Sequence, residues 1–249
     1  MKYIFGNWKM YLNVEESIAL AKELKQKIVL NANFTYAVFP NTLAFGDVAD
    51  VLVNSPVACG AQNTTWFPRG AYTGETSADM FKDEGAEYVL IGHSERRHVF
   101  GEDNETIRKK LEACFDAGMT AVLCIGETKE DRDADKTTYR LRKQLLKALE
   151  GLELNDKELI IAYEPVWAIS KGGVGQPCTP TDAADMHVLI EKELRQITNA
   201  DIPIIYGGSV GVENVASYLS HASIDGVLVG NASTKLESFV SLIDNALTV

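Results

Sequence analysis

The sequence predicts an α/β fold, a single (β/α)8 barrel that spans residues 1–249. Eight short apolar runs alternate with amphipathic helical patterns, and the units recur about every thirty residues, as expected of βα repeats in a barrel. The apolar runs are continuous rather than alternating, which is typical of parallel strands covered on both faces. The chain has 249 residues and is 46% hydrophobic, enough for the sizeable core of one barrel.

The strands are predicted at the apolar runs Tyr3–Phe5, Tyr36–Phe39, Val57–Cys59, Tyr88–Ile91, Ala121–Ile125, Leu159–Tyr163, Ile204–Tyr206 and Val227–Val229. Between them, Asn13 and Glu16 form a capping box ahead of an apolar stripe. Thr179 before Pro180 supplies an N-cap with proline at the first helical position. Apolar spacing predicts further helices over Thr106–Ala117, which stops before Gly118, over Thr137–Leu149 and over Leu236–Leu247.

A doubly wound sheet is the structural alternative. Its first turn would require the pattern G-x-G-x-x-G, whereas the first strand here ends in Gly6-Asn7-Trp8-Lys9. The sequence contains no GxxxxGK[ST] pattern, so a P-loop is also absent.

The composition limits the partners. The formal net charge is -11, from 35 acidic and 24 basic residues, which argues against nucleic acid and anionic membranes. An anionic substrate would need local positive groups acting against this global field. Nothing approaches a transmembrane span.

The cysteines and the N-terminus predict a cytoplasmic protein. Cys59, Cys114, Cys124 and Cys178 show no CxxC spacing and are interpreted as free thiols in a reducing compartment. The stretch Met1–Asn7 lacks the long apolar core of a signal peptide.

Glu164 is the first candidate catalytic residue. It follows the apolar run Leu159–Tyr163, and Pro165 ends that strand because proline lacks an N–H and fixes φ. A carboxylate on rigid backbone at the C-terminal end of a barrel strand is where such a fold would place a general base.

Other strand ends add a coherent set of groups to the same rim. The first strand offers Asn7 and Lys9, and the fourth leads into His93, Ser94 and Glu95. The seventh and eighth lead into two glycine-rich turns, whose backbone N–H groups can bind phosphate. These turns are Gly207-Gly208-Ser209 and Gly230-Asn231-Ala232-Ser233.

Taken together, eight motifs resemble the triosephosphate isomerase family, in order and with nearly the family's spacing along the whole chain. They are Gly6–Met10, Ala61–Asn63, Gly70–Glu75, Ile91–Arg97, Cys124–Glu127, Tyr163–Ala168, Tyr206–Val210 and Gly230–Ser233. The resemblance implies that Glu164 moves a proton between adjacent carbons of a triose phosphate. By the argument already established for this family, a neutral His93 at a helix N-terminus donates to the carbonyl oxygen and stabilises the enediolate.

The remaining implied roles concern charge and phosphate. Lys9 supplies positive charge, Asn7 helps to position the set, and Glu95 holds Lys9. The phosphate would be bound by Ser170, Gly208, Ser209, Gly230 and Asn231. The chemistry needs no organic cofactor and no metal, and the scattered histidines His98, His187 and His221 show no metal-ligand spacing.

The loop after Glu164 departs from the family pattern. Between Ile169 and Pro180 it is about three residues longer than usual, an extension that loop-closure entropy makes inexpensive. Ser170 stands where the family has a glycine, and a positive φ there would cost roughly 1–2 kcal/mol. We expect a lid that still closes on phosphate with altered opening rates. Asn231 also replaces a usual glycine, and asparagine tolerates left-handed backbone.

Two segments outside the rim carry further expectations. The segment Gln62–Gly74 is too long for a bare surface turn. The resemblance implies that it docks into a second subunit, with Thr73 near the partner's active site, to form a homodimer. The charged run 127–135 is predicted to be a solvated connection.

The leading functional hypothesis is interconversion of dihydroxyacetone phosphate and D-glyceraldehyde 3-phosphate, in glycolysis and gluconeogenesis. The altered lid motivates a first alternative, the same chemistry on a longer ketose phosphate such as a tetrulose phosphate. A second alternative is a non-catalytic sugar-phosphate-binding barrel. An aldolase fits less well, because Lys171 lies in the lid rather than on a strand and clustered histidines are missing.

Overall fold

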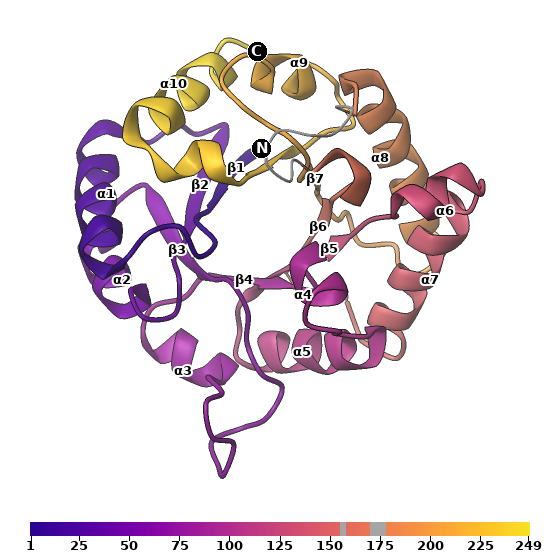
Figure 1. Ribbon diagram of the computed structural model, residues 1–249, viewed down its shortest axis with the longest axis horizontal. Helices are drawn as coiled ribbons and strands as arrows, with labels where there is room; N and C mark the ends of the chain where they lie inside the picture. Colours follow the sequence, from indigo (N-terminus) through magenta and orange to yellow (C-terminus); the bar gives the residue numbers. More distant parts are fainter. Residues whose placement is uncertain (155–157, 170–177) are drawn as a thin grey trace.

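The computed structural model describes residues 1–154, 158–169 and 178–249. Figure 1 shows a central ring of strands surrounded by helices. The strands are all parallel and close in the order β1 to β8, which confirms the predicted (β/α)8 barrel. Their bounds are β1 Lys2–Asn7, β2 Phe34–Phe39, β3 Val57–Ala61, β4 Tyr88–Ile91, β5 Thr120–Ile125, β6 Leu159–Tyr163, β7 Ile204–Tyr206 and β8 Gly226–Val229.

The helices form the outer layer (Figure 1). Those described are α1 Val14–Lys27, α2 Phe45–Leu52, α3 Ala78–Asp83, α4 Ser94–His98, α5 Asn104–Asp116, α6 Lys129–Asp133, α7 Thr137–Leu149, α8 Pro180–Leu194, α9 Val215–Leu219 and α10 Leu236–Ala246, with 3₁₀ turns η1 Val166–Ala168 and η2 Asn231–Thr234. None of the helices in the described part of the chain is long and apolar enough to cross a bilayer.

Side-chain caps set the helix boundaries. The Asn13 side chain accepts from the Glu16 N–H, and the Glu16 carboxylate accepts from the Asn13 N–H, both at 2.9 Å, so the predicted capping box is present. Thr179 caps α8 with its side chain alone, which accepts from the Asp182 N–H at 3.1 Å. Helix α5 begins two residues earlier than predicted, because Asp103 accepts from the Thr106 N–H and starts the helix there.

The core has two parts, because successive residues of a strand point to opposite faces. Inside the barrel lie Phe5, Ala37, Phe39, Leu90, Val122, Cys124, Ile160, Ala162, Ile205 and Leu228. A larger cluster fills the space between the strands and the helices. Each strand therefore packs against other side chains on both of its faces, which explains why its apolar residues are continuous in the sequence. All four cysteines are buried free thiols.

A buried histidine makes the stability sensitive to acid. His187 on α8 is 0% exposed; its Nδ1–H donates to the Ser223 carbonyl at 3.1 Å, and its Nε2 has no partner within the described residues. Burial lowers the pKa of His187 from 6.5 to about 4. As the pH falls from above 6.5 to about 4, His187 binds a proton in the unfolded chain but stays neutral in the folded chain, so protonation favours unfolding.

We therefore expect His187 alone to remove about 3 kcal/mol of unfolding free energy over that range, measured by urea denaturation at fixed protein concentration. In the variant His187→Asn, whose side-chain amide can still donate to Ser223, this part of the pH dependence should disappear. An unchanged pH slope in the variant would contradict the assignment.

Candidate active site

The predicted rim residues meet around one cavity at the C-terminal ends of the strands. The cavity has a volume of about 330 Å³. The residues that line it lie on β1, β4, β6, β7 and β8 or in the turns that follow these strands. Of the predicted site residues it is lined by Asn7, Lys9, His93, Glu164, Gly208, Ser209, Gly230 and Asn231.

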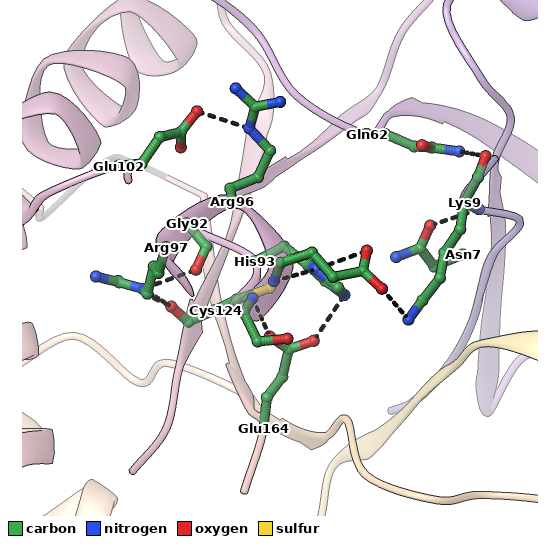
Figure 2. Close-up of polar contacts among 12 residues, drawn as sticks. Asn7, Lys9, Gln62, Gly92, His93, Arg96, Arg97, Glu102, Cys124 and Glu164 are labelled. Carbon is green, nitrogen blue, oxygen red and sulfur yellow. Dashed lines mark hydrogen bonds and ion pairs between the residues drawn. The ribbon is translucent and has the colours of Figure 1, made fainter. Parts of the chain in front are cut away.

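Glu164 is 2% exposed and points toward His93 from the end of β6 (Figure 2). Its Oε1 lies 3.0 Å from His93 Nε2, and its Oε2 accepts from the Ser94 N–H at 2.9 Å. Burial by itself raises the pKa of Glu164, but the contacts with His93, the Ser94 N–H and the charge of Lys9 together lower the pKa below its ordinary value. The carboxylate is therefore ionised and able to act as a base at neutral pH.

His93 is the N-cap residue of α4 and is 5% exposed. Its Nδ1 accepts from the Glu95 N–H at 3.2 Å, whereas the Glu95 carboxylate is farther away, at 3.5 Å. A nitrogen that accepts a backbone N–H carries no proton itself. The proton of the neutral ring is therefore on Nε2, which faces Glu164 and the cavity.

Lys9 has a left-handed backbone, with φ of 49°, which costs a non-glycine residue roughly 1–2 kcal/mol. Side chains hold both of its backbone polar groups (Figure 2). The Lys9 N–H donates to Asn7 Oδ1 at 3.0 Å, and the Lys9 carbonyl accepts from Gln62 Nε2 at 2.8 Å. The Lys9 ammonium lies 2.8 Å from Glu95 Oε1.

Gln62 makes hydrogen bonds that were not predicted from the sequence. Its Nε2 also donates to the Phe39 carbonyl at 2.8 Å, so one amide ties Lys9 to the end of β2. If this amide keeps Lys9 in its strained backbone conformation, Gln62→Leu should displace the ammonium. We expect kcat/KM to fall about 10-fold, because small displacements of a catalytic group lower the rate of the reaction.

Steady-state kinetics on a phosphorylated triose would measure this effect. Asn41→Leu is the matched control, because Asn41 donates to the carbonyl of Leu12 in the same loop and takes no part in the hydrogen bonds that hold Lys9. Equal kinetic losses in the two variants would contradict a specific role for Gln62.

The turns after β7 and β8 line the opposite part of the cavity. A Cβ on Gly208 would lie 2.0 Å from the Tyr206 hydroxyl oxygen, so this turn has room only for glycine unless the Tyr206 ring moves. Asn231 does not have a positive φ, so the tolerance expected of asparagine is not needed there. Lys9 is the one cationic side chain among the cavity-lining residues of the described chain.

The charged run 127–135 is only partly the solvated connection that was predicted. Lys129, Glu130 and 133–135 are exposed, whereas Glu127 and Asp131 are buried. Glu127 is 0% exposed, and its carboxylate accepts from the Trp167 indole N–H at 2.7 Å and from the Tyr163 hydroxyl at 3.1 Å. Arg132 lies 3.6 Å from the same carboxylate. Burial raises the pKa of Glu127. From the local sequence this carboxylate is predicted to be a surface charge. Its donors Tyr163 and Trp167 lie on β6 and in the turn after it, so nothing near Glu127 in the sequence indicates that it is buried.

Three predicted site residues do not line the cavity. Glu95 is exposed and reaches the site through its contact with the Lys9 ammonium. Ser170 lies outside the described residues, and so does most of the lengthened lid. Thr73 is exposed in the loop between β3 and α3, which projects beyond the ring of helices (Figure 1). The sequence reasoning missed Tyr11, Ile169 and Gly211, which do line the cavity and lie next to the recognised motifs.

This geometry combines an ionised carboxylate, a neutral imidazole donor and an ammonium in one partly enclosed space. The carboxylate can take a proton, and the imidazole N–H and the ammonium can stabilise negative charge on a nearby oxygen. Backbone turns on the far side can hold an anionic group. The described residues contain no cluster of histidine, cysteine, aspartate or glutamate suited to a metal ion.

Comparison with known proteins identifies relatives along nearly the whole chain. A family model described as triosephosphate isomerase matches residues 2–246. A triosephosphate isomerase of Protochlamydia amoebophila is 41% identical over 247 residues, which are 97% of this chain and 92% of the relative. Those of Aquifex aeolicus and Carboxydothermus hydrogenoformans are 38% and 40% identical and cover 97% and 98% of this chain and 98% of each relative.

Proposed function

The chain belongs to the triosephosphate isomerase family, and we propose that it interconverts dihydroxyacetone phosphate and D-glyceraldehyde 3-phosphate through an enediolate. The observation that carries the mechanism is the Glu164 carboxylate, 3.0 Å from His93 Nε2 in a cavity that also contains Lys9. This arrangement suits proton transfer between adjacent carbons, which requires one base and donors to two neighbouring oxygens.

Glu164 and His93 share the proton transfer. The Glu164 carboxylate takes a proton from C1 of dihydroxyacetone phosphate. The electron pair of the broken C–H bond forms the C1–C2 double bond, and the π pair of the carbonyl group moves onto the oxygen at C2. The Nε2–H of neutral His93 donates to that oxygen, and protons are redistributed between the two oxygens of the enediolate. The carboxylic acid then returns its proton to C2. Before the first transfer, substrate must replace the contacts of Glu164 with His93 and Ser94.

Lys9 and the backbone turns bind the anionic ends. We assign Lys9 to the developing enediolate and to the phosphate, because it opposes the overall charge of -11 within the cavity. Gly208, Ser209, Gly230 and Asn231 are proposed to bind the phosphate, with Ser170 joining them when the lid closes. Asn7 and Glu95 are proposed to position Lys9, which each of them contacts.

A coupled isomerase assay tests this proposal. The wild-type chain should turn over triose phosphate faster than a tetrulose phosphate, and Glu164→Gln should be nearly inactive. Faster turnover of the tetrulose phosphate would favour the longer substrate. Binding without turnover by both wild type and variant would favour a non-catalytic sugar-phosphate barrel.

We further propose a homodimer built on the loop that carries Thr73. Within this loop Phe67 stacks on Tyr72 with ring centroids 4.0 Å apart, so the loop has a preformed shape. Exposed apolar side chains accompany it at the same end of the barrel, including Met10 at 93% and Phe100 at 65% exposure. Light scattering at micromolar concentration should give the mass of two chains, and a monomer would remove this proposal.

The setting of the enzyme is also a proposal. We propose one barrel domain over residues 1–249 that acts in the cytoplasm, in glycolysis and gluconeogenesis. The four buried thiols, all without a disulfide, support a reducing compartment.

A further inference from the structure

Gln144 is a buried polar residue on the core-facing side of α7. It is 5% exposed, and its neighbours along this face are the apolar Leu141, Leu145 and Ala148. A primary amide in such a position is costly unless its oxygen and its nitrogen are both hydrogen-bonded. In Gln144 both polar atoms have a partner, and both partners belong to one residue: Oε1 accepts from the Gly126 N–H at 2.9 Å, and Nε2 donates to the Gly126 carbonyl at 3.1 Å.

Gly126 directly follows β5 and lies against the backbone of the proposed base. A Cβ at this position would lie 1.8 Å from the Glu164 carbonyl oxygen, closer than any side chain allows. Hydrogen bonds on either side fix the same contact. The Glu164 N–H donates to the Ile125 carbonyl at 2.7 Å, and the Val166 N–H donates to the Glu127 carbonyl at 3.1 Å.

The opposite side of Glu164 is limited by a second glycine. The Gly207 N–H donates to the Tyr163 carbonyl at 2.8 Å, and a Cβ on Gly207 would lie 2.8 Å from Glu164 Cγ. Glu164 is therefore confined between two glycine backbones. One of these backbones, that of Gly126, is held in place by the Gln144 amide from the outer helix layer.

We propose that Gln144 is a positioning residue for the isomerase reaction: by fixing Gly126 at both its N–H and its carbonyl, it sets the backbone position of Glu164. The inference rests on the proposed function, in which Glu164 is the base. Gln144 acts through Gly126 and belongs to none of the chain segments that line the cavity. Its removal should therefore affect the proton-transfer step more than the binding of substrate.

The variant Gln144→Met keeps the length and helix propensity of the side chain but loses both hydrogen bonds. We expect kcat to fall about 10-fold while KM stays within about twofold, because a shift of tenths of an ångström misaligns the base without altering the phosphate site. Leu141→Ala, one turn earlier on the same buried face, is the control, because it loosens the packing of α7 and leaves both hydrogen bonds between Gln144 and Gly126 in place. It should lower thermal stability and leave kcat within about twofold of wild type.

All variants would be measured beside wild type and Glu164→Gln in one coupled assay. An inactive wild type would refute the proposed function. An active wild type, an inactive Glu164→Gln and a Gln144→Met variant with wild-type kcat would refute only the role of Gln144, and so would equal kcat losses in Gln144→Met and Leu141→Ala. If Gln144→Met does not fold, Gln144→Glu decides. It keeps an acceptor for the Gly126 N–H, so a several-fold loss of kcat supports the role and an unchanged kcat overturns it.

Discussion

Replacement of Glu164 with glutamine is expected to lower kcat by roughly 10²- to 10⁴-fold, the contribution typical of a positioned general base. The amide has nearly the shape of the carboxylate, and its oxygen can still accept from the Ser94 N–H. It cannot take a proton from carbon, and its NH₂ group would face the Nε2–H of His93. The loss should therefore fall on the chemical step rather than on folding.

The coupled assay measures this loss, and two comparisons make it specific. Inorganic phosphate should inhibit Glu164→Gln and wild type at similar concentrations, because the phosphate turns are unchanged. Glu164→Asp keeps the carboxylate but withdraws it by one methylene, and should lose about 10²-fold through misplacement alone. If Glu164→Gln retained more than about a tenth of the wild-type kcat, Glu164 would not be the base.

The second large effect is expected for Lys9→Met. This change removes the one cation among the described cavity-lining residues from a chain whose net charge is already -11. We expect kcat to fall about 10²-fold, because a donor to the developing enediolate is lost. KM should rise about 10-fold as well, because the dianionic phosphate loses its attraction to the site.

Lys25→Met is the matched control for Lys9→Met. It makes the same change in net charge at a distant site on α1, where Lys25 donates to the carbonyls of Val51 and Val53. Steady-state kinetics at low and high salt should show a salt-dependent kcat/KM for wild type and Lys25→Met and a weaker dependence for Lys9→Met. Similar losses in both lysine variants would mean that only the overall charge matters.

Strand positions and the gathering of the rim residues could be predicted from the sequence, because both follow from rules that act along the chain. Buried parallel strands need apolar side chains on both faces, and closure of the barrel brings all the strand ends together. The predicted capping box of Asn13 and Glu16 is local in the same sense. The strands and the caps depend on residue type and spacing within one βα unit, and the gathering of the strand ends follows from repetition of that unit around the barrel.

The contacts that fix the site depend on residues far apart in the sequence, and these could not be predicted. Glu127 was read as a surface charge, although Tyr163 and Trp167 donate to it in the interior. Neither the left-handed Lys9 nor the Gln62 amide that holds it follows from local pattern, since 53 positions separate the two. A hydrogen bond of this kind, from a side chain to a distant backbone group, needs only one suitable amide. A single amide leaves no periodic pattern in the sequence from which the bond could be predicted.

The central claim is that the carboxylate of Glu164 removes hydrogen from carbon as a proton. Running the isomerisation in heavy water and following deuterium on the substrate carbons by NMR tests it most directly. Wild type should place deuterium at the carbon that receives the proton, and Glu164→Gln should show almost none above the uncatalysed background. Conversion without deuterium uptake, or uptake that the glutamine variant leaves intact, would contradict the account.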